Sequence, residues 1–135
     1  MINNDKPTQS SQTMAVAASA LKAQQARMRV IAENIGRTPG ADPYRRQTPV
    51  FTSAPVDGAT GVKLANVVQD MSAFQQEYDP THPAADATGY VKKPNVNPLI
   101  ETMDMREAQR SYEANLNVIE TARAMTQKTL DILEK

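Results

Sequence analysis

The side chains that could do chemistry in this sequence are few, and the first to consider is its single histidine, His82. Asp79 and Asp86 lie near it in a proline-rich stretch, so one imidazole and two carboxylates could form a weak metal site. No second histidine and no helix face would hold these ligands in place, which favours a solvated loop. We therefore predict that the chain binds no metal ion and no cofactor.

Paired carboxylates are the second chemistry to consider, because glycoside hydrolysis and related reactions use two of them. Glu101 and Asp104 are three residues apart in a predicted helix, where surface charges that complement the helix N-terminus are the better interpretation. No serine or threonine can be placed beside a histidine base, and no glycine-rich phosphate loop is present. We predict that the chain is not an enzyme and has no catalytic residues.

A basic pair with an adjacent aromatic residue, Tyr44-Arg45-Arg46, could contact a phosphate or stack on a base. The whole chain, however, has 15 basic and 15 acidic residues and a net charge of zero. Such a balance provides no electrostatic drive toward nucleic acid or an anionic membrane. We predict no nucleic-acid partner and interpret the pair as a surface or interface contact. Cysteine is absent, which excludes disulfides and thiolate metal sites.

The stretch that organises the rest of the chain is residues 97–135, which we predict to form one long helix. Asn97 is a good N-cap, and Pro98 suits the first helical position because its missing N–H costs nothing there. No glycine or proline follows Pro98. At 1.5 Å per residue the helix would be about 55 Å long, which is more than a compact domain of this size needs.

Two apolar stripes lie on different sides of this long helix when its residues are placed at about 100° intervals. The heptad stripe suits a coiled-coil seam, because several of its members are separated by multiples of seven. A single partner helix can cover only one stripe, so we predict that both are used in a bundle or at subunit interfaces. The heptad stripe contains Met105, Ala108, Tyr112, Leu116, Ile119, Leu130 and Leu133. The second stripe contains Ile100, Met103, Ala114, Val118, Met125 and Ile132.

Residues 14–36 are predicted to form a shorter helix that starts near Ser11 or Thr13 and ends at Gly36, a natural left-handed cap. This helix also has a heptad stripe and a second stripe, so we expect the two helices to pair as an antiparallel coiled-coil or bundle element. Each helix would then keep one stripe for other molecules. Residues 1–13 are polar and without periodicity, and we predict a disordered tail. The predicted interface residues of the shorter helix are Met14, Val16, Leu21, Met28, Val30 and Ile35.

The apolar run at residues 14–21 resembles the core of a signal peptide. The preceding segment lacks a basic cluster and the run is short, so we favour a helix and expect no cleaved signal. No stretch approaches the roughly 18 apolar residues of a membrane-spanning helix. We predict that the chain is not membrane-spanning.

Residues 37–96, between the helices, are predicted to form the β part of a mainly α fold. Turn-rich segments divide it into short strands, and Pro49 confines the first strand to an edge. We expect a turn at 57–61, before the second strand, and we expect the third strand to pair with the second. Four short strands cannot form a large sheet, so a small hairpin-based lobe or an extended clasp is expected. The predicted strands are residues 44–52, 62–68, 74–78 and 90–92.

Both predicted helices resemble those of a known family. Residues 19–35 (SALKAQQARMRVIAENI) are similar to the N-terminal helix of bacterial flagellar rod, hook and related axial proteins. Residues 95–125 resemble their C-terminal helix, including the RSYEAN core. After Ile35 the chain departs from the family, because it runs directly into GRTP without the usual Ala-Asn segment.

The middle of the chain resembles, more narrowly, the short proximal-rod proteins of the flagellar basal body. Four groups of residues appear in the family's order, and the similarity covers nearly the whole chain after Thr13. These groups are PYRR at 43–46, GVK at 61–63, YDP with HP at 78–83, and GYV through PNVN at 89–97.

This resemblance implies a structural subunit of the flagellar basal-body rod that assembles helically through its terminal helices and transmits motor torque. It implies export through the flagellar type III apparatus without a cleaved signal, and a place in the rod that spans the periplasm. The implied partners are further copies of the chain and other rod proteins. An alternative that the helices leave open is a soluble helical adaptor or secretion chaperone that dimerises through its apolar stripes.

Overall fold

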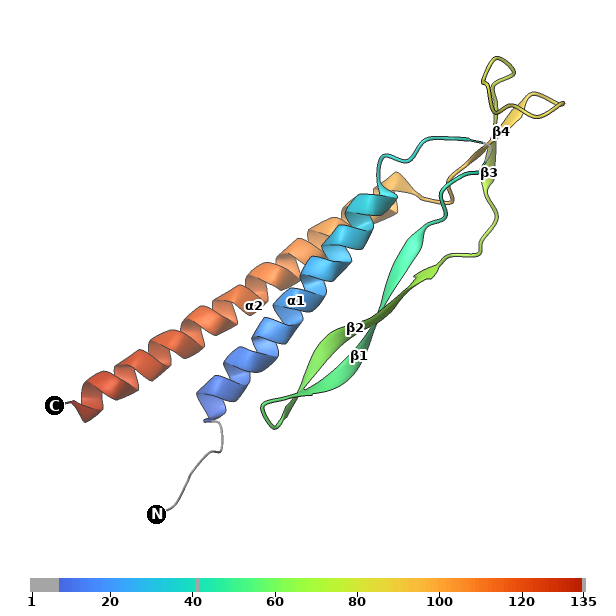
Figure 1. The fold of residues 1–135 in the computed structure, drawn as a ribbon. Helices are drawn as coiled ribbons and strands as arrows, with labels where there is room; N and C mark the ends of the chain where they lie inside the picture. The colour runs from blue at the N-terminus through green and yellow to red at the C-terminus, as the bar shows by residue number, and fades with distance from the viewer. Residues whose placement is uncertain (1–7, 41, 135) are drawn as a thin grey trace.

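The computed structural model describes residues 8–40 and 42–134. In Figure 1, two helices lie side by side and run in opposite directions, and a long β-hairpin follows the shorter helix. A small second β-hairpin forms the end of the molecule farthest from the C-terminus. The mainly α fold with a small β part is thereby confirmed. In chain order the elements are α1 (Gln9–Asn34), β1 (Gln47–Val56), β2 (Ala59–Gln69), β3 (Gln75–Tyr78), β4 (Tyr90–Lys93) and α2 (Pro98–Leu133).

The start of α2 confirms the predicted cap. The side-chain oxygen of Asn97 accepts a hydrogen bond from the backbone N–H of Leu99 at 3.0 Å, and Pro98 occupies the first turn. From there α2 continues without interruption to Leu133. Its length follows from its composition, since no residue inside it breaks a helix.

Replacing Asn97 with alanine is expected to destabilise the folded chain by about 1 kcal/mol, because the first turn of α2 loses its side-chain acceptor. Thermal unfolding followed by circular dichroism would measure the loss. Asn97→Asp is the matched control, since a carboxylate can accept the same hydrogen bond. A variant with alanine as stable as the parent would show that water satisfies the Leu99 N–H equally well.

The predicted start of the first helix is wrong. α1 begins at Gln9, and the hydroxyl of Thr8 caps it by accepting from Ser11 N–H at 3.1 Å. Residues 8–13 therefore do not belong to a disordered tail, and residues 1–7 lie outside the described residues. Polar serines and threonines obscured this turn in the sequence, and a tertiary hydrogen bond from Gln12 Nε2 to the backbone oxygen of Asp57 (3.0 Å) holds it in place.

The other end of α1 lies where it was predicted. The last helical residue is Asn34, Ile35 forms the cap, and Gly36 follows with a φ of 79°. Such a left-handed conformation suits glycine because it has no Cβ.

β1 and β2 form an antiparallel hairpin whose turn is Asp57-Gly58. Both turn residues have positive φ, 48° and 81°, which is the geometry that an Asp-Gly pair favours in two-residue hairpins. β2 starts at Ala59, so the turn is shorter than the predicted 57–61 and the strands are longer. The tight turn lets both strands extend to the full length of α1 (Figure 1).

The predicted pairing of the third strand is wrong. β3 pairs with β4, in a register that places Tyr78 opposite Tyr90, and not with β2. The two tyrosine rings meet edge to face with their centroids 5.3 Å apart. Local pattern does not reveal this pairing, because β3 and β4 are joined through an eleven-residue connection whose turns bring them together.

The core lies around α1, which contacts α2 on one side and the β1–β2 hairpin on another. The β1–β2 hairpin approaches α1 closely at Gly61, where an added Cβ would lie 2.6 Å from the Ser19 hydroxyl oxygen. The expectation that each helix keeps a stripe for other molecules is therefore wrong for α1, because the hairpin covers it. The buried apolar residues are small: Ala17, Ala23, Ala26, Val30, Ile31, Val91, Ala108 and Ala122.

Candidate assembly surface and polar junction

The six α1 residues predicted at subunit interfaces mostly pack inside the chain. Val30 is only 5% exposed, and Met14, Val16, Leu21 and Met28 are half-buried. Ile35, at the C-terminal end of α1, is the exposed exception. The structure therefore places most of this helix in the intramolecular core.

The heptad stripe of α2 is divided along its length. Met105, Tyr112 and Ile119 are half-buried in the part of α2 that packs beside α1. Leu130 and Leu133 are exposed, because α2 continues beyond the first turn of α1 (Figure 1). Leu116 lies within the half-buried part of the stripe but is itself exposed. A single stripe thus has an intramolecular half and an unpaired half.

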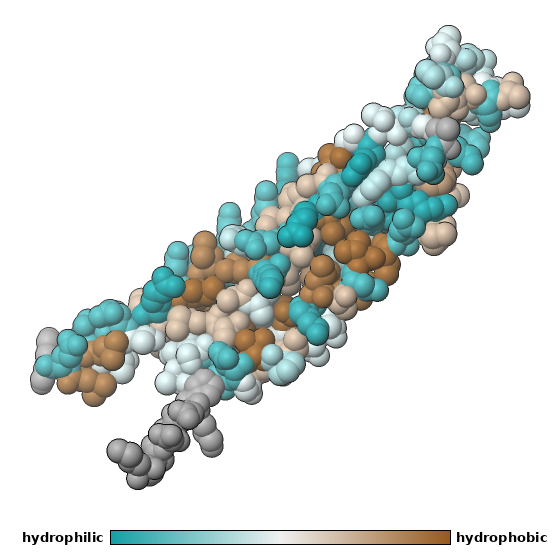
Figure 2. All heavy atoms as spheres, in the orientation of Figure 1, coloured by the Kyte–Doolittle hydropathy of each residue, from teal (hydrophilic) through white to brown (hydrophobic). Residues whose placement is uncertain are grey.

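The second stripe of α2 is exposed throughout. Its five large members have between 42% and 73% of their surface accessible to solvent, and Ala114 is exposed as well. In Figure 2, hydrophobic side chains lie at the end of the molecule that carries the C-terminus, and larger hydrophobic patches lie in its middle. We call the exposed large apolar residues of the two stripes the assembly surface of α2: Ile100, Met103, Leu116, Val118, Met125, Leu130, Ile132 and Leu133.

An open groove of about 510 Å³ joins the assembly surface to the start of α1. Val118, Ala122 and Met125 line it from α2, and Gln9 and Thr13 line it from α1. The groove marks the place where α1 stops covering α2. It gives the assembly surface a recess that can receive an apolar side chain.

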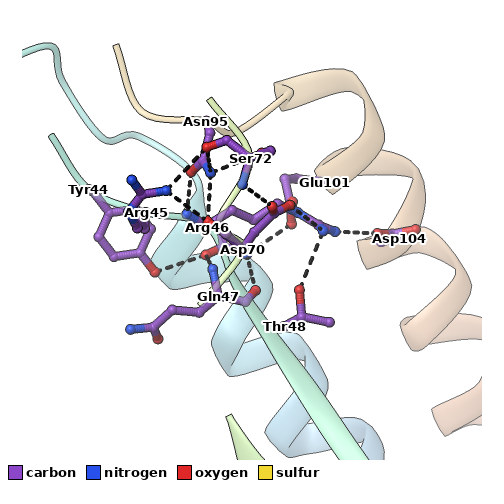
Figure 3. Close-up of polar contacts among 11 residues, drawn as sticks. Tyr44, Arg45, Arg46, Gln47, Thr48, Asp70, Ser72, Asn95, Glu101 and Asp104 are labelled. Atoms are coloured by element: carbon purple, nitrogen blue, oxygen red, sulfur yellow. Dashed lines mark hydrogen bonds and ion pairs between the residues drawn. The ribbon is translucent and has the colours of Figure 1, made fainter. Parts of the chain in front are cut away.

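A polar junction lies at the other end of the helices, where five segments of the chain meet (Figure 3). Asn34, at the end of α1, is almost fully buried. Its side-chain oxygen accepts from the Tyr44 hydroxyl at 2.8 Å and from Gln47 N–H at 2.9 Å, while its amide donates to the Gln47 backbone oxygen at 2.8 Å. Burial raises the pKa of Tyr44. Asn34 therefore fixes both the first loop and the start of β1.

Arg46 and Glu101 form the central ion pair of the junction. Glu101 is 0% exposed and accepts from Arg46 Nε and from Asn34 Nδ2, the latter at 3.3 Å. Arg46 also lies 3.5 Å from Asp104 and 3.9 Å from Asp70. The hydrogen bond to Glu101 raises the pKa of Arg46. One guanidinium thus links the start of α2 to the segments that flank the hairpin.

Asn95 completes the junction from the segment before α2. Its side-chain oxygen accepts from Arg46 N–H at 2.7 Å, and its amide donates to the backbone oxygens of Asp70 and Ser72. The backbone N–H of Ser72 in turn lowers the pKa of Asp70. Arg45 bonds the same two carbonyls and stacks over the Phe74 ring at 4.3 Å. These contacts set the direction in which the β3–β4 hairpin leaves the helices.

Two sequence-based interpretations of these residues are wrong. Glu101 is not a surface charge, and Arg46 is an internal contact of the chain. The signal that could have found them is the charge complementarity of the basic pair at 45–46 with the acidic pair at the start of α2. Spacing alone could not show that the two segments meet.

The remaining candidate for chemistry, His82, serves a turn. Its imidazole Nδ1 accepts from Ala84 N–H at 3.0 Å, and its backbone N–H donates to the Asp79 backbone oxygen. Asp86 accepts from the Thr88 hydroxyl, which lowers the pKa of Asp86. Residues 8–40 and 42–134 contain no group of three or more His, Cys, Asp or Glu side chains placed to hold a metal ion.

Comparison with known proteins identifies the family. Residues 87–132 match the model described as flagellar basal body rod FlgEFG protein C-terminal. The chain is 50% identical over 127 residues to the flagellar basal-body rod protein FlgC of Agrobacterium fabrum, which covers 88% of this chain and 91% of that protein. It is 40% identical over 124 residues to FlgC of Salmonella typhimurium, and this alignment covers 87% of this chain and 92% of that protein. The chain belongs to the FlgC family of flagellar basal-body rod proteins.

The relationship extends to distant bacteria. FlgC of Bacillus subtilis is 38% identical over 140 residues, covering 87% of this chain and 93% of that protein. FlgC proteins are structural components of the flagellar basal-body rod, and this chain is a structural rod subunit. Neither of the two helices in the described residues has the length and apolarity needed to span a bilayer.

The polar junction is built largely from the motifs by which the chain resembles FlgC. The PYRR motif supplies Tyr44, Arg45 and Arg46, and the PNVN motif supplies Asn95 and the cap Asn97. These residues hold the loops to the ends of both helices. In this FlgC chain the motifs therefore have an architectural role.

Proposed function

We propose that this chain is a proximal-rod subunit that assembles helically, with copies of itself and other rod proteins, through the assembly surface of α2. The observation that carries the proposal is the exposure of this surface along α2, including the end of α2 that projects beyond the first turn of α1. Exposed apolar surfaces of this extent mark interaction sites. The interface residues that we propose on α2 are the exposed residues that make up the assembly surface.

The energetics favour association. Burying about 400 Å² of apolar surface per neighbour contributes roughly 10 kcal/mol at 25 cal/mol per Å², before the entropic costs of association are subtracted. Contacts of this head-to-tail kind extend into a helical filament when their rotation does not close a ring. In such a rod, the terminal helices pair as coiled coils with neighbouring subunits and carry torque from the motor.

Export is the second part of the proposal. We infer that the chain passes through the flagellar type III apparatus without a cleaved signal peptide, into the rod that spans the periplasm. Support comes from the small core, whose members are mostly alanine and valine. A domain that buries little apolar surface unfolds readily, which suits passage through a narrow channel. The role is structural and involves no catalysis, cofactor or metal.

A soluble adaptor or secretion chaperone that dimerises through the same surface is the alternative. It would differ in solution, because a closed dimer consumes the assembly surface and stops growing. Light scattering of the purified chain distinguishes the two: a discrete dimer at all concentrations favours the adaptor, and open-ended association favours the rod subunit.

The decisive experiment is deletion of the gene from its own flagellated bacterium. We expect the strain to be non-motile, with basal bodies that lack a rod beyond the membrane ring, and the intact gene to restore both. Electron microscopy of isolated basal bodies provides the measurement. Complete rods in the deletion strain would contradict the proposal.

Hydrogen exchange tests the unpaired state of α2 directly. In dilute monomer, we expect amides C-terminal to Met125 to exchange much faster than those between Ala108 and Ala122, because α1 covers only the latter. The same C-terminal amides should become protected in assembled rods. Strong protection along all of α2 in the monomer would show that this end needs no neighbour.

A further inference from the structure

After the assembly surface of α2, the outer edge of β2 is the second extended part of the chain with unpaired groups, which here are backbone N–H and C=O groups. Within the described residues the β1–β2 sheet has two strands only, so each strand presents one edge of backbone N–H and C=O groups. Such edges pair readily with other extended chains, and natural proteins block the edges that must stay single. The two edges of this hairpin differ in that respect.

The register shows which groups point outward. Gln47 lies opposite Gln69 and donates its N–H to Asn34, and Pro49 lies opposite Val67 and has no N–H. Neither pair can therefore exchange hydrogen bonds across the sheet, which makes both non-hydrogen-bonded pairs of an antiparallel ladder. The N–H groups of Val67 and Gln69 accordingly point away from β1.

The edge of β1 is blocked. Pro49 and Pro55 occupy outward positions on it, and the outward N–H of Gln47 is bonded to Asn34. Proline at an outward position removes a donor and prevents another strand from pairing there.

The edge of β2 is covered at one end and open at the other. Val62 N–H, at the start of the strand, donates to the Ser19 hydroxyl of α1 at 3.2 Å. Residues 63–69 are all exposed, contain no proline and carry Lys63 as their one charge. Leu64, Val67 and Val68 are 36%, 40% and 41% exposed. Ala65 has no partner in the register, so a bulge interrupts the strand at this point. The open edge with a regular register is therefore residues 66–69.

We propose that residues 66–69 of β2 bind an extended segment of a neighbouring rod subunit as a third β-strand. An extended polypeptide is the ligand class that matches a row of outward backbone donors and acceptors at strand spacing. The blocked β1 edge directs the addition to one side of the hairpin. The inference rests on the proposed function, since it requires neighbours in an assembly. A two-fold pairing of β2 with β2 would close a dimer and end growth, so the donor is a different segment.

Val67→Pro is the direct test, because it removes an outward donor and leaves the ladder with β1 intact. Ser53→Pro is the matched control. Ser53 lies opposite Val62, and because the N–H of Val62 points away from β1, this is a non-hydrogen-bonded pair and the N–H of Ser53 points outward too. The substitution therefore removes an outward donor from the β1 edge. In a deletion strain complemented with each gene, we expect Val67→Pro to lose swimming and complete rods, and Ser53→Pro to retain both. Circular dichroism of the two purified chains checks that each folds.

Two further variants decide the remaining outcomes. Val67→Lys keeps the N–H but places a charge on the edge, and its loss of rods would support the proposal even if Val67→Pro failed to fold. Complete rods with Val67→Lys or with folded Val67→Pro would overturn it. If those strains form complete rods and the Val118→Glu strain forms none, strand addition at β2 is overturned. The proposed assembly through α2 then still stands.

A cross-link identifies the donor. The chain has no cysteine, so Gln69→Cys introduces a single thiol beside the edge. We expect a bifunctional thiol–amine reagent to join it, in isolated basal bodies, to a lysine in an extended segment of another rod subunit. Cross-links only to residues within the same chain would contradict strand addition.

Discussion

Replacing Val118 with glutamate is expected to abolish rod assembly and swimming while leaving the monomer folded. Val118 is 42% exposed on α2 and borders the groove beside α1, so a carboxylate there can reach water in the isolated chain. In an assembled rod the same carboxylate would be buried against an apolar neighbour. The lost apolar burial and the uncompensated charge together cost about 3 kcal/mol or more, roughly a hundredfold in affinity at each contact.

The matched control is Gln109→Glu, which adds the same charge on α2 away from the groove. Gln109 is exposed and does not belong to the assembly surface. Motility on soft agar and electron microscopy of basal bodies measure both variants in the deletion strain, with secreted protein measured to confirm export. Normal swimming by Val118→Glu would remove this part of α2 from the interface.

Replacing Glu101 with alanine is expected to cause the largest loss of stability of any single change at the polar junction. The carboxylate is fully buried and bonds both Arg46 and Asn34, so its removal leaves a cavity and an unpaired donor. We expect a loss of about 2–4 kcal/mol. The value lies below the upper limit for buried ion pairs because Arg46 is partly exposed and keeps Asp104 and Asp70 as neighbours.

Asp104→Asn is the control for Glu101→Ala. It removes a charge that also faces Arg46, but at 3.5 Å and with a third of the side chain exposed, so we expect less than about 1 kcal/mol. Urea unfolding followed by circular dichroism measures both variants. Equal losses would show that the general charge near Arg46 matters and that the burial of Glu101 does not.

The glycine and proline positions made much of the fold predictable. Asn97-Pro98 marked the start of the long helix, Gly36 marked the end of the short one, and Asp57-Gly58 marked the hairpin turn. These signals act through backbone geometry, which depends on the residue itself and its immediate neighbours. The second stripe of α2 was equally predictable, since its exposure follows from helical periodicity and the shortage of partners in so short a chain.

The pairing of strands and the covering of α1 could not be predicted in the same way. β3 lacks a pattern that distinguishes β4 from β2 as its partner, and nothing near α1 shows that a hairpin will lie against its second stripe. The interface assignment for the exposed residues of α2 remains a prediction, since an isolated chain shows a free surface and not its occupant.

The sequence by itself determined the two helices, the N-cap of α2, the end of α1, the place of the hairpin turn and the family, because each depends on local conformational preference or on residues read in order. The tertiary structure alone decided that Glu101 is buried against Arg46, that α1 is covered on two sides, and that β2 keeps an open edge. These features depend on segments far apart in the chain. Whether a charge is paired or a strand edge is free is settled only when the folded chain brings its neighbours into place.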